Sequence, residues 1–397
     1  MLLFIQSIIV YGLIIWVMTY FGNIAYRKQY PQGFGGIDMF QNRKISFITL
    51  FTRTYFVIPI LVFCFFAAVR YRVGADCEAY KSIFYQIIQF GKVDREEAVE
   101  IGFLALVKVT KLFTNSHYLL FFILAFLQIG LLYYAQRKST YSLKFFGVSL
   151  FLSITYFSLM NGIRQNIAAC AFVALLPLIR EKKWIWYILG VYVATFIHKS
   201  AYLLLPLGIV AFFLKSKIPN KYVQLGLVAI CFIFMDEIKI DGIMNSFSTF
   251  AAEIGYNESQ IEVYTSWEDM NKRFGLRSLL LLASYIITIC YSKKMKTLFN
   301  SKIFNMQYNL FFIGICLSFL FNNNFVINRL LYYLKIFIPI ILSSCMFYLW
   351  NSKRKNDKLF FSLLIFVLAI VILYQLYVSL QLFPNEFSLY KFDLFRT

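Results

Sequence analysis

The sequence predicts an all-α protein, a polytopic transmembrane helix bundle of about twelve spans. Apolar residues make up 60% of the 397 residues and charged residues only 15%, whereas soluble domains carry about 45–50% and about 25%. The apolar residues form stretches that approach the ~20 residues a helix needs to cross the hydrocarbon, with short charged loops between them. We therefore expect one integral membrane domain over residues 1–397 and no separate soluble domain.

Twelve apolar stretches are the expected spans, and two regions outside them have their own interpretation. The first stretch has neither a basic region before it nor a small-residue cleavage site after it, so we interpret it as a retained span. Lys108 and Lys111 interrupt segment 101–114, which we expect to lie flat in the membrane interface. Outer loops at about 70–117 and 236–276 are expected to form short capping helices. The expected spans are 2–21, 52–69, 118–135, 145–160, 166–179, 184–197, 201–214, 222–235, 277–291, 306–321, 330–350 and 359–381.

The charge distribution predicts an orientation. The net charge is +20, but the basic residues recur in short alternate loops instead of forming one stripe, which argues against nucleic acid as a partner. The other set of loops contains nearly all of the remaining acids. Because cytoplasmic loops of membrane proteins carry an excess of Lys and Arg, the basic set is expected in the cytoplasm and both termini outside.

Several function classes lack their usual residues. Of seven cysteines only Cys77 lies in a polar loop, and no CxxC spacing occurs, so neither a disulfide framework nor a cysteine metal site is expected. No Walker loop, dinucleotide glycine fingerprint, HExxH or nucleophile elbow is present, which argues against ATP-driven transport, zinc proteolysis and serine hydrolysis.

The first polar motif runs from Arg70 to Asp76, with Tyr80 and Phe84 after it. Two arginines, Arg70 and Arg72, leave the end of a span, and the arginine fork suits phosphate oxygens. Asp76 could orient an arginine or accept a proton from a hydroxyl. The alternative is structural: interfacial anchoring by the arginines and capping of the next helix by Asp76.

The second motif, residues 161–166, opens an Ala-rich span with Arg164 and Gln165 near its start. A helix N-terminus favours anions, so an arginine there predicts an anionic partner. Interfacial anchoring is the alternative for Arg164.

The third motif is His198-Lys199-Ser200, at the short turn between two spans. A neutral imidazole could act as general base on a sugar hydroxyl, and Lys199 could add positive charge near a phosphate. A hydrogen-bonded histidine that closes a tight turn is the alternative.

The fourth motif contains Asn322 to Asn324 and then Asn328 to Tyr333, with Arg329 opening a span and Lys335 inside it. Charged residues within a span cost about 2.5–3.5 kcal/mol and usually face a partner or a wet cavity. Since Arg329 and Lys335 are six positions apart, a continuous helix would place them on different faces. A structural role is the alternative for Arg329, and snorkelling or pairing is the alternative for Lys335.

The predicted topology puts all four motifs at the outer surface. Together they describe a cationic cavity with one possible base and one acid. A lipid diphosphate fits such a cavity, because its head group is anionic and its tail enters from the bilayer.

These motifs resemble those of a known family. The Arg70 to Asp76 run with Tyr80 and Phe84, Gly-Ile-Arg-Gln at 162–165, His-Lys-Ser-Ala at 198–201 and Asn-Arg-Leu-Leu-Tyr-Tyr at 328–333 are similar to the EpsG family, in matching order over about residues 50–340. Ala75 stands where the family pattern often has threonine. The resemblance implies a Wzy-type polysaccharide polymerase similar in fold to type C membrane glycosyltransferases.

Such a protein would move a glycan from an undecaprenyl diphosphate carrier to the non-reducing end of another lipid-linked repeat unit. No cofactor or metal is expected, and a chain-length regulator and a flippase are expected partners. The location implied is the bacterial inner membrane, with the active site facing the periplasm or exterior. Carried over by motif position, Arg70, Arg72, Arg164 and Arg329 would bind diphosphate and His198 or Asp76 would assist the acceptor hydroxyl, while Gln165, Lys199 and Tyr333 would complete the substrate site.

Three other functions remain compatible with these residues. A flippase or exporter of lipid-linked sugars would need similar arginines, but with polar residues along a path through the bilayer. A glycan ligase would share nearly all of the features. A non-enzymatic assembly scaffold would tolerate loss of the motif arginines.

Overall fold

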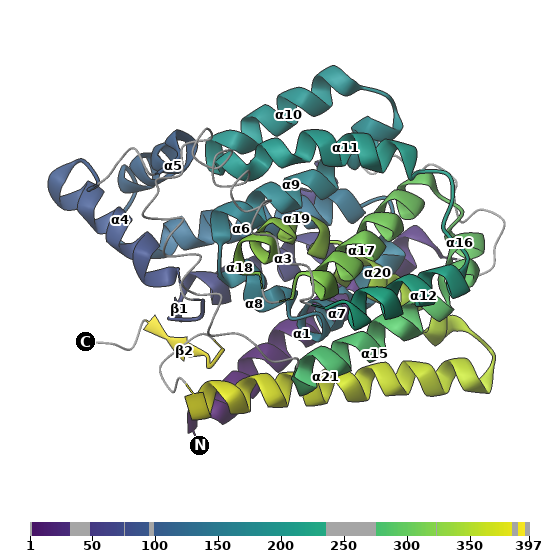
Figure 1. Cartoon of the computed structure of the whole chain (residues 1–397). Helices are drawn as coiled ribbons and strands as arrows, with labels where there is room; N and C mark the ends of the chain where they lie inside the picture. Colours follow the sequence, from purple (N-terminus) through teal and green to yellow (C-terminus); the bar gives the residue numbers. More distant parts are fainter. Residues whose placement is uncertain are drawn as a thin grey trace.

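The computed structural model describes residues 2–31, 48–74, 76–94, 99–235, 275–322, 324–382 and 388–393. Most of these residues are helical, and Figure 1 shows the longer helices running in roughly one direction. Within the described ranges the only sheet is a two-residue antiparallel pair, β1 (Arg70–Tyr71) and β2 (Lys391–Phe392). The expected all-α membrane bundle is therefore confirmed.

Six helical segments are long and apolar enough to cross a membrane. A seventh candidate is the bent pair of α15 (Leu276–Cys290) and α16 (Ser292–Phe299), whose axes differ by 54°. The six are α1 (Leu2–Gln29), α6 (Tyr118–Gln136), α9 (Ile163–Arg180), α17 (Lys302–Leu320), the segment Ile327–Asn351, and α21 (Lys355–Leu382).

The remaining expected spans coincide with apolar helices of 10–17 residues. A helix of 15 residues is only about 22 Å long, shorter than a hydrocarbon core of about 30 Å. The count of about twelve spans therefore stays a prediction. The shorter helices are α3 (Thr54–Ala68), η2 with α7 (Thr140–Leu152), α10 (Trp184–Ile197), η3 with α11 (Lys199–Phe213) and α12 (Lys221–Ile233).

Two of the expected spans are broken. Segment 145–160 contains α7 (Phe146–Leu152) and α8 (Thr155–Met160), and Ile154 between them has a positive φ of 61°. The expected span 330–350 contains the end of α18 (Phe325–Leu330), then α19 (Tyr332–Lys335) and α20 (Ile338–Asn351). Non-helical backbone at membrane depth is tolerated where it is buried in protein or lines a cavity.

Close helix packing builds the core. α1 packs along η2 (Thr140–Phe145), and α3 and α9 both pack against α6. At Gly22 of α1 a Cβ atom would lie only 2.1 Å from the carbonyl oxygen of Leu143, so this approach needs glycine.

The loop at 70–117 contains two short helices, as expected: α4 (Cys77–Phe90) and α5 (Ile101–Lys111). Figure 1 shows both at one end of the molecule, and α5 contacts α4, α6 and α10. Whether α5 lies flat in the interface stays a prediction. Nearly all of the expected outer loop at 236–276 lies outside the described residues.

The C-terminal segment 388–393, called here the C-terminal clasp, packs at the same end. The Tyr390 N–H donates to Oγ of Ser7 (2.8 Å), and the Tyr11 hydroxyl donates to the carbonyl of Ser388 (2.5 Å). The Asp393 N–H donates to the carbonyl of Val69 (2.9 Å), beside the β1–β2 pair. The clasp thus connects the start of α1 to the first polar motif.

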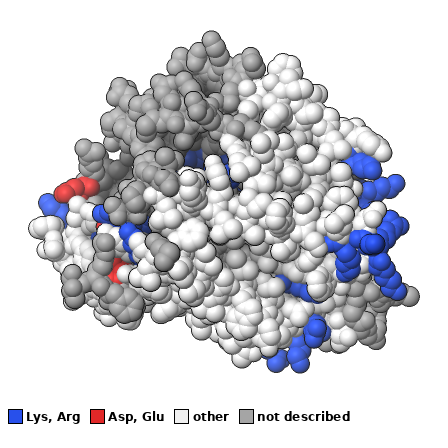
Figure 2. All heavy atoms as spheres, turned by 90° about the horizontal axis from the view of Figure 1, so that it is seen from below, with Lys and Arg blue, Asp and Glu red and all other residues white. Residues whose placement is uncertain are grey.

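Lysine and arginine side chains gather at the opposite end. Figure 2 shows most of the blue side chains on this face at the end where α16 and the start of α21 lie in Figure 1. The acidic side chains visible in this view lie at the other end. We call these the basic end and the site end.

Candidate functional site

The first and second motifs meet at the N-terminus of α9. The Asp76 carboxylate accepts the backbone N–H of Gly162 (2.9 Å), and the Asp76 N–H donates to Oδ1 of Asn161 (3.2 Å). Gly74, at φ 93°, allows the close packing, because a Cβ there would lie 2.2 Å from the Met160 carbonyl oxygen. The Asp76 side chain makes no capping hydrogen bond to the N-terminus of α4. The alternative expectation, that Asp76 caps this helix, is therefore not what the structure shows.

Glu100 joins the second and third motifs. Its Oε1 lies 2.8 Å from Nδ1 of His198 and accepts the backbone N–H of Lys199 (3.2 Å). Its Oε2 forms an ion pair with the Arg164 guanidinium. Glu100, Arg164 and His198 are mostly buried, with side-chain exposures of 8%, 21% and 12%. We call these three residues the carboxylate cluster.

The fourth motif is tied to the second and the third. The Gln165 amide donates to the carbonyl of Arg329 (2.7 Å), and the Tyr333 hydroxyl lies 2.7 Å from Oγ of Ser200. Gln165 and Tyr333 are buried, and both side chains brace neighbouring segments. All four motifs are thus connected around the start of α9.

The carboxylate cluster has defined protonation states near neutral pH. Burial raises the pKa of Glu100, but the hydrogen bond from His198 and the charge of Arg164 outweigh it and lower this pKa to about 2. Burial lowers the pKa of His198, although Glu100 acts in the opposite direction, and the charges of Arg164 and Arg329 lower it further. Glu100 is therefore ionised and His198 neutral at pH 7.

A cavity of about 470 Å³ adjoins this region, within the range typical of ligand sites. Three cationic side chains line it, Arg277, Arg329 and Lys335, and no Asp or Glu does so among the described lining residues. The broken segments contribute to its wall, including Ser153, Ile154 and Thr155 between α7 and α8. We call it the basic cavity, and an anionic ligand matches its charge.

The expectation that Arg329 and Lys335 lie on different helix faces is wrong. Both line the basic cavity, because the helix is interrupted at Leu331 between α18 and α19. The Lys335 ammonium also donates to Oδ1 of Asn328 (2.8 Å) across this break. A break changes the angular relation of residues that a continuous helix would separate.

Arg70 and Arg72 do not line this cavity. Arg70 is 2% exposed, and its guanidinium donates to the carbonyls of Val73 (2.9 Å) and Ala67, so it stabilises the turn before α4. Arg72 lies at the surface, 3.7 Å from the Glu78 carboxylate. The structure thus brings Arg164 and Arg329 to the region of His198 but gives Arg70 and Arg72 other contacts.

Two residues of this region are not among the predicted site residues. Glu100 lies in the expected outer loop at about 70–117, and nothing in its local sequence indicates that two distant basic residues reach it. Arg277 could have been found, because it opens an apolar segment as Arg164 and Arg329 do. In the structure Arg277 also donates to Oε1 of Gln375 (3.2 Å) on α21.

Fold and site together define a class: a polytopic helical membrane protein with a basic, ligand-sized cavity beside a buried Glu–Arg–His cluster. The model of the EpsG family matches residues 53–392, which is most of the chain, and the protein belongs to that family. Membership implies a membrane protein of the exopolysaccharide-polymerase type. Neither a curated protein nor a solved structure matches the chain.

Proposed function

We propose that this protein is a metal-independent glycosyltransferase that polymerises a polysaccharide. It would transfer a glycan from an undecaprenyl-diphosphate-linked donor to the non-reducing end of a second lipid-linked repeat unit. The acidic site end would face the periplasm or cell exterior, and the basic end the cytoplasm. A flippase that delivers the repeat units and a chain-length regulator would be its partners.

One observation carries the proposal: three cations meet in one cavity in which no described side chain is acidic. When the sugar–phosphate bond breaks, negative charge grows on the departing lipid diphosphate. Fixed cations stabilise that charge more in the transition state than in the ground state. Arg329 and Arg277 can each donate two parallel hydrogen bonds to phosphate oxygens, and Lys335 adds a point charge.

The proposed reaction forms one bond and breaks one. The acceptor hydroxyl oxygen bonds to the anomeric carbon, and the bond from that carbon to the diphosphate oxygen breaks. The hydroxyl proton would pass to His198, directly or through a water, at Nε2, since Nδ1 faces Glu100. Glu100 orients the imidazole as carboxylates do in other catalytic histidine pairs.

The other predicted residues take supporting roles in this proposal. Asp76 holds the N-terminus of α9 through Gly162 and is a positioning residue instead of the base. Arg164 sets the orientation of Glu100, and Gln165 and Tyr333 hold the fourth motif in place. The Lys199 ammonium would contact a phosphate of the second lipid-linked chain.

Chain extension in liposomes with purified lipid-linked repeat units tests the proposal. Arg329→Ala should lower the extension rate by about 10²- to 10³-fold, as loss of one oxyanion-stabilising donor does elsewhere. Lys353→Ala, which removes an exposed cation at the basic end, is the matched control and should extend normally.

Each other outcome has a defined meaning. Undiminished extension by a folded Arg329→Ala, Arg277→Ala double variant would rule out the basic cavity as the site. Delivery of lipid-linked repeat units across the liposome membrane without any chain extension would identify a flippase. Transfer of finished glycan to an acceptor that is not a repeat unit would identify a ligase.

A further inference from the structure

A second cavity, of about 580 Å³, extends to the basic end and shares no described lining residue with the basic cavity. It is formed by α1 from Gly12 to Arg27, the junction of η2 with α7, and the last turn of α20. Ser7 of α1 contacts the C-terminal clasp at the site end, whereas Arg27 near the end of the same helix lines this cavity. With a rise of 1.5 Å per residue, the two positions are about 30 Å apart.

The charged side chains described in the lining of this cavity are all basic. Arg27 and Lys144 line it, and no carboxylate does so among the described lining residues. Neither cation forms an ion pair with an Asp or Glu within the described ranges. Two like charges at one cleft without a carboxylate favour an anionic ligand.

Aromatic side chains line the same cavity as the two cations. Lys144 lies 5.4 Å from the ring of Trp350, and Trp16 stacks on Tyr20 at 5.5 Å with the planes 17° apart. Tyr20 and Trp350 are 50% and 45% exposed, and Trp350 lies in the last turn of α20, which is the amphipathic pattern of residues at the head-group level of a bilayer. Trp16, 60% exposed, lies halfway along α1 beside the apolar side of the cleft. The cleft therefore lies where lipid head groups are expected.

The rest of the wall suits a molecule with a polar head and an apolar tail. The Thr19 hydroxyl is buried without a hydrogen-bond partner within the described residues and offers an unused donor. Gly12, Ile15 and Val148 form an apolar side, and a Cβ at Gly12 would meet nothing within 4 Å. A free inorganic anion would gain nothing from this apolar side.

We propose that this cleft is a binding site for an anionic phospholipid of the leaflet at the basic end. Its phosphate lies between Arg27 and Lys144, and one acyl chain runs along Gly12, Ile15 and Val148. Basic pockets between transmembrane helices on the cytoplasmic side are suited to such head groups. The site would anchor α1 and α20 to the membrane and is independent of the proposed glycosyl transfer.

Tryptophan quenching by brominated lipids tests this site. Replacing Trp184, Trp186 and Trp267 by Phe leaves Trp16 and Trp350, both in the cleft, as the reporters. The protein is reconstituted in phosphatidylcholine vesicles that contain a small fraction of brominated phosphatidylglycerol or, separately, brominated phosphatidylcholine. The anionic lipid should quench at a lower fraction, with a preference of roughly 5-fold per cation.

Three variants separate the proposal from its alternatives. Arg27→Ala with Lys144→Ala should abolish the preference, whereas Lys217→Ala with Lys293→Ala, which removes two exposed cations elsewhere, should retain it. Gly12→Leu keeps both charges but fills the apolar side, so it should weaken quenching by the anionic lipid.

Several results would overturn the proposal. These are equal quenching by both lipids in the parent protein, equal loss of preference in both double variants, and undiminished quenching in Gly12→Leu. Displacement of the brominated lipid by inorganic phosphate would show instead a site for soluble phosphate. Size-exclusion profiles establish that each variant is folded.

Discussion

Glu100 organises the site at the level of single residues. It lies between His198 and the Arg164 guanidinium, which come from separate helical segments, and it also accepts the Lys199 N–H. A buried carboxylate with two basic partners remains ionised and fixes both. The contribution of Glu100 to the stability of the protein depends on the charge of its carboxylate as well as on the shape of its side chain.

Replacing Glu100 by Gln should therefore destabilise the protein strongly. The buried Arg164 would lose its counter-ion, a change that costs about 3–5 kcal/mol when one partner of a buried pair is removed. Thermal unfolding in detergent measures the effect. Glu181→Gln, which breaks the exposed pairs with Arg180 and Lys183, is the control and should cost less than about 1 kcal/mol. Equal stability of the two variants would contradict the structural role of Glu100.

The lowered pKa of His198 predicts the pH dependence of chain extension. A folded-state pKa below the ordinary value of about 6.5 means that His198 is neutral above that pH and gains a proton only below it. Extension should be constant above about pH 6.5 and fall as the pH drops through the pKa of His198, because a protonated imidazole cannot accept the hydroxyl proton. The same protonation favours the unfolded state, so stability also decreases in this direction.

Rates measured from pH 5 to 8 test this dependence. His198→Asn should be slow and lack the inflection. His117 also has a pKa lowered by burial, so His117→Asn is the necessary control and should retain the inflection. An inflection above pH 7, or one that disappears with His117, would argue against His198 as the base.

At the level of helices and strands, two broken helices determine which residues form the wall of the basic cavity. The interruptions at Ile154 and Leu331 bring backbone and side chains of two segments to one wall. Gln165, from the start of α9, bonds to the Arg329 carbonyl just before the second break. The position of Arg329 therefore depends on α9 as much as on its own helix.

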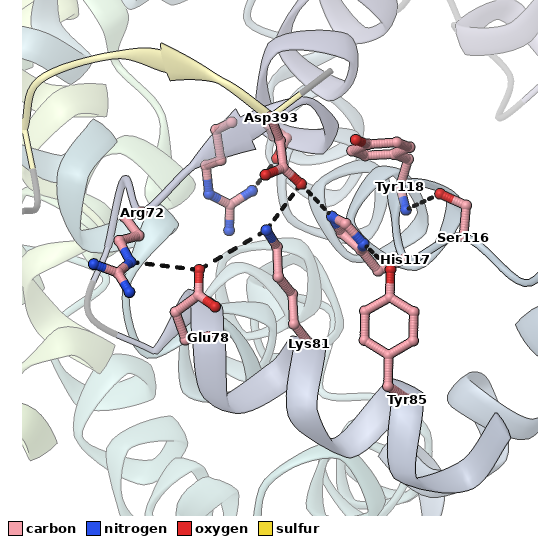
Figure 3. Close-up of polar contacts among 10 residues, drawn as sticks. Arg72, Glu78, Lys81, Tyr85, Ser116, His117, Tyr118 and Asp393 are labelled. Carbon is pink, nitrogen blue, oxygen red and sulfur yellow. Dashed lines mark hydrogen bonds and ion pairs between the residues drawn. The ribbon is translucent and has the colours of Figure 1, made fainter. Parts of the chain in front are cut away.

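The C-terminal clasp is the second element that positions the site. Figure 3 shows Asp393 facing Lys81 and His117, and its Oδ2 lies 2.8 Å from Lys81 Nζ and 2.8 Å from His117 Nε2. The Tyr85 hydroxyl lies 2.8 Å from the other ring nitrogen of His117. Together with the β1–β2 pair, these contacts hold the turn that leads to Asp76.

Asp393→Asn should loosen this turn. The substitution removes the charge that pairs with Lys81, and hydrogen bonds to charged groups contribute about 1.5–3 kcal/mol. Amide hydrogen exchange should become faster at residues 69–76 and remain unchanged in α17. Asp94→Asn, at an exposed carboxylate that bonds to Gln86, is the matched control. Unchanged exchange at 69–76 would show that the clasp does not hold the turn.

At the scale of the whole molecule, charged side chains are distributed unevenly along the direction of the long helices. The basic side chains gather at one end, and Ser7 and Tyr390, near the two ends of the described chain, meet at the other. We therefore expect an even number of crossings between these two residues. The positive-inside rule then predicts a cytoplasmic basic end.

Cysteine labelling in intact cells tests this orientation. In a background in which all seven native cysteines are replaced, Lys217→Cys and Lys353→Cys should resist a membrane-impermeant maleimide until the cells are opened. Glu78→Cys, at the site end, should react in intact cells. The reverse pattern would place the site end in the cytoplasm, away from the proposed reaction. Chain extension by the cysteine-free protein serves as the control for folding.

The sequence by itself determined the membrane class, the helical segments, the charge asymmetry and the four motifs. Hydropathy and charge are local properties, and each can be read from a short window of residues. The family resemblance has the same basis, because each motif is a short run such as 162–165 or 328–333.

Only the tertiary structure decided which motif residues meet. It showed Glu100 between Arg164 and His198, placed Lys335 and Arg277 in the same cavity as Arg329, and buried the Arg70 side chain. These relations depend on helix breaks and on the packing of segments up to some hundreds of residues apart. No local pattern encodes them, because a side chain's direction is set by the whole bundle against which its helix packs.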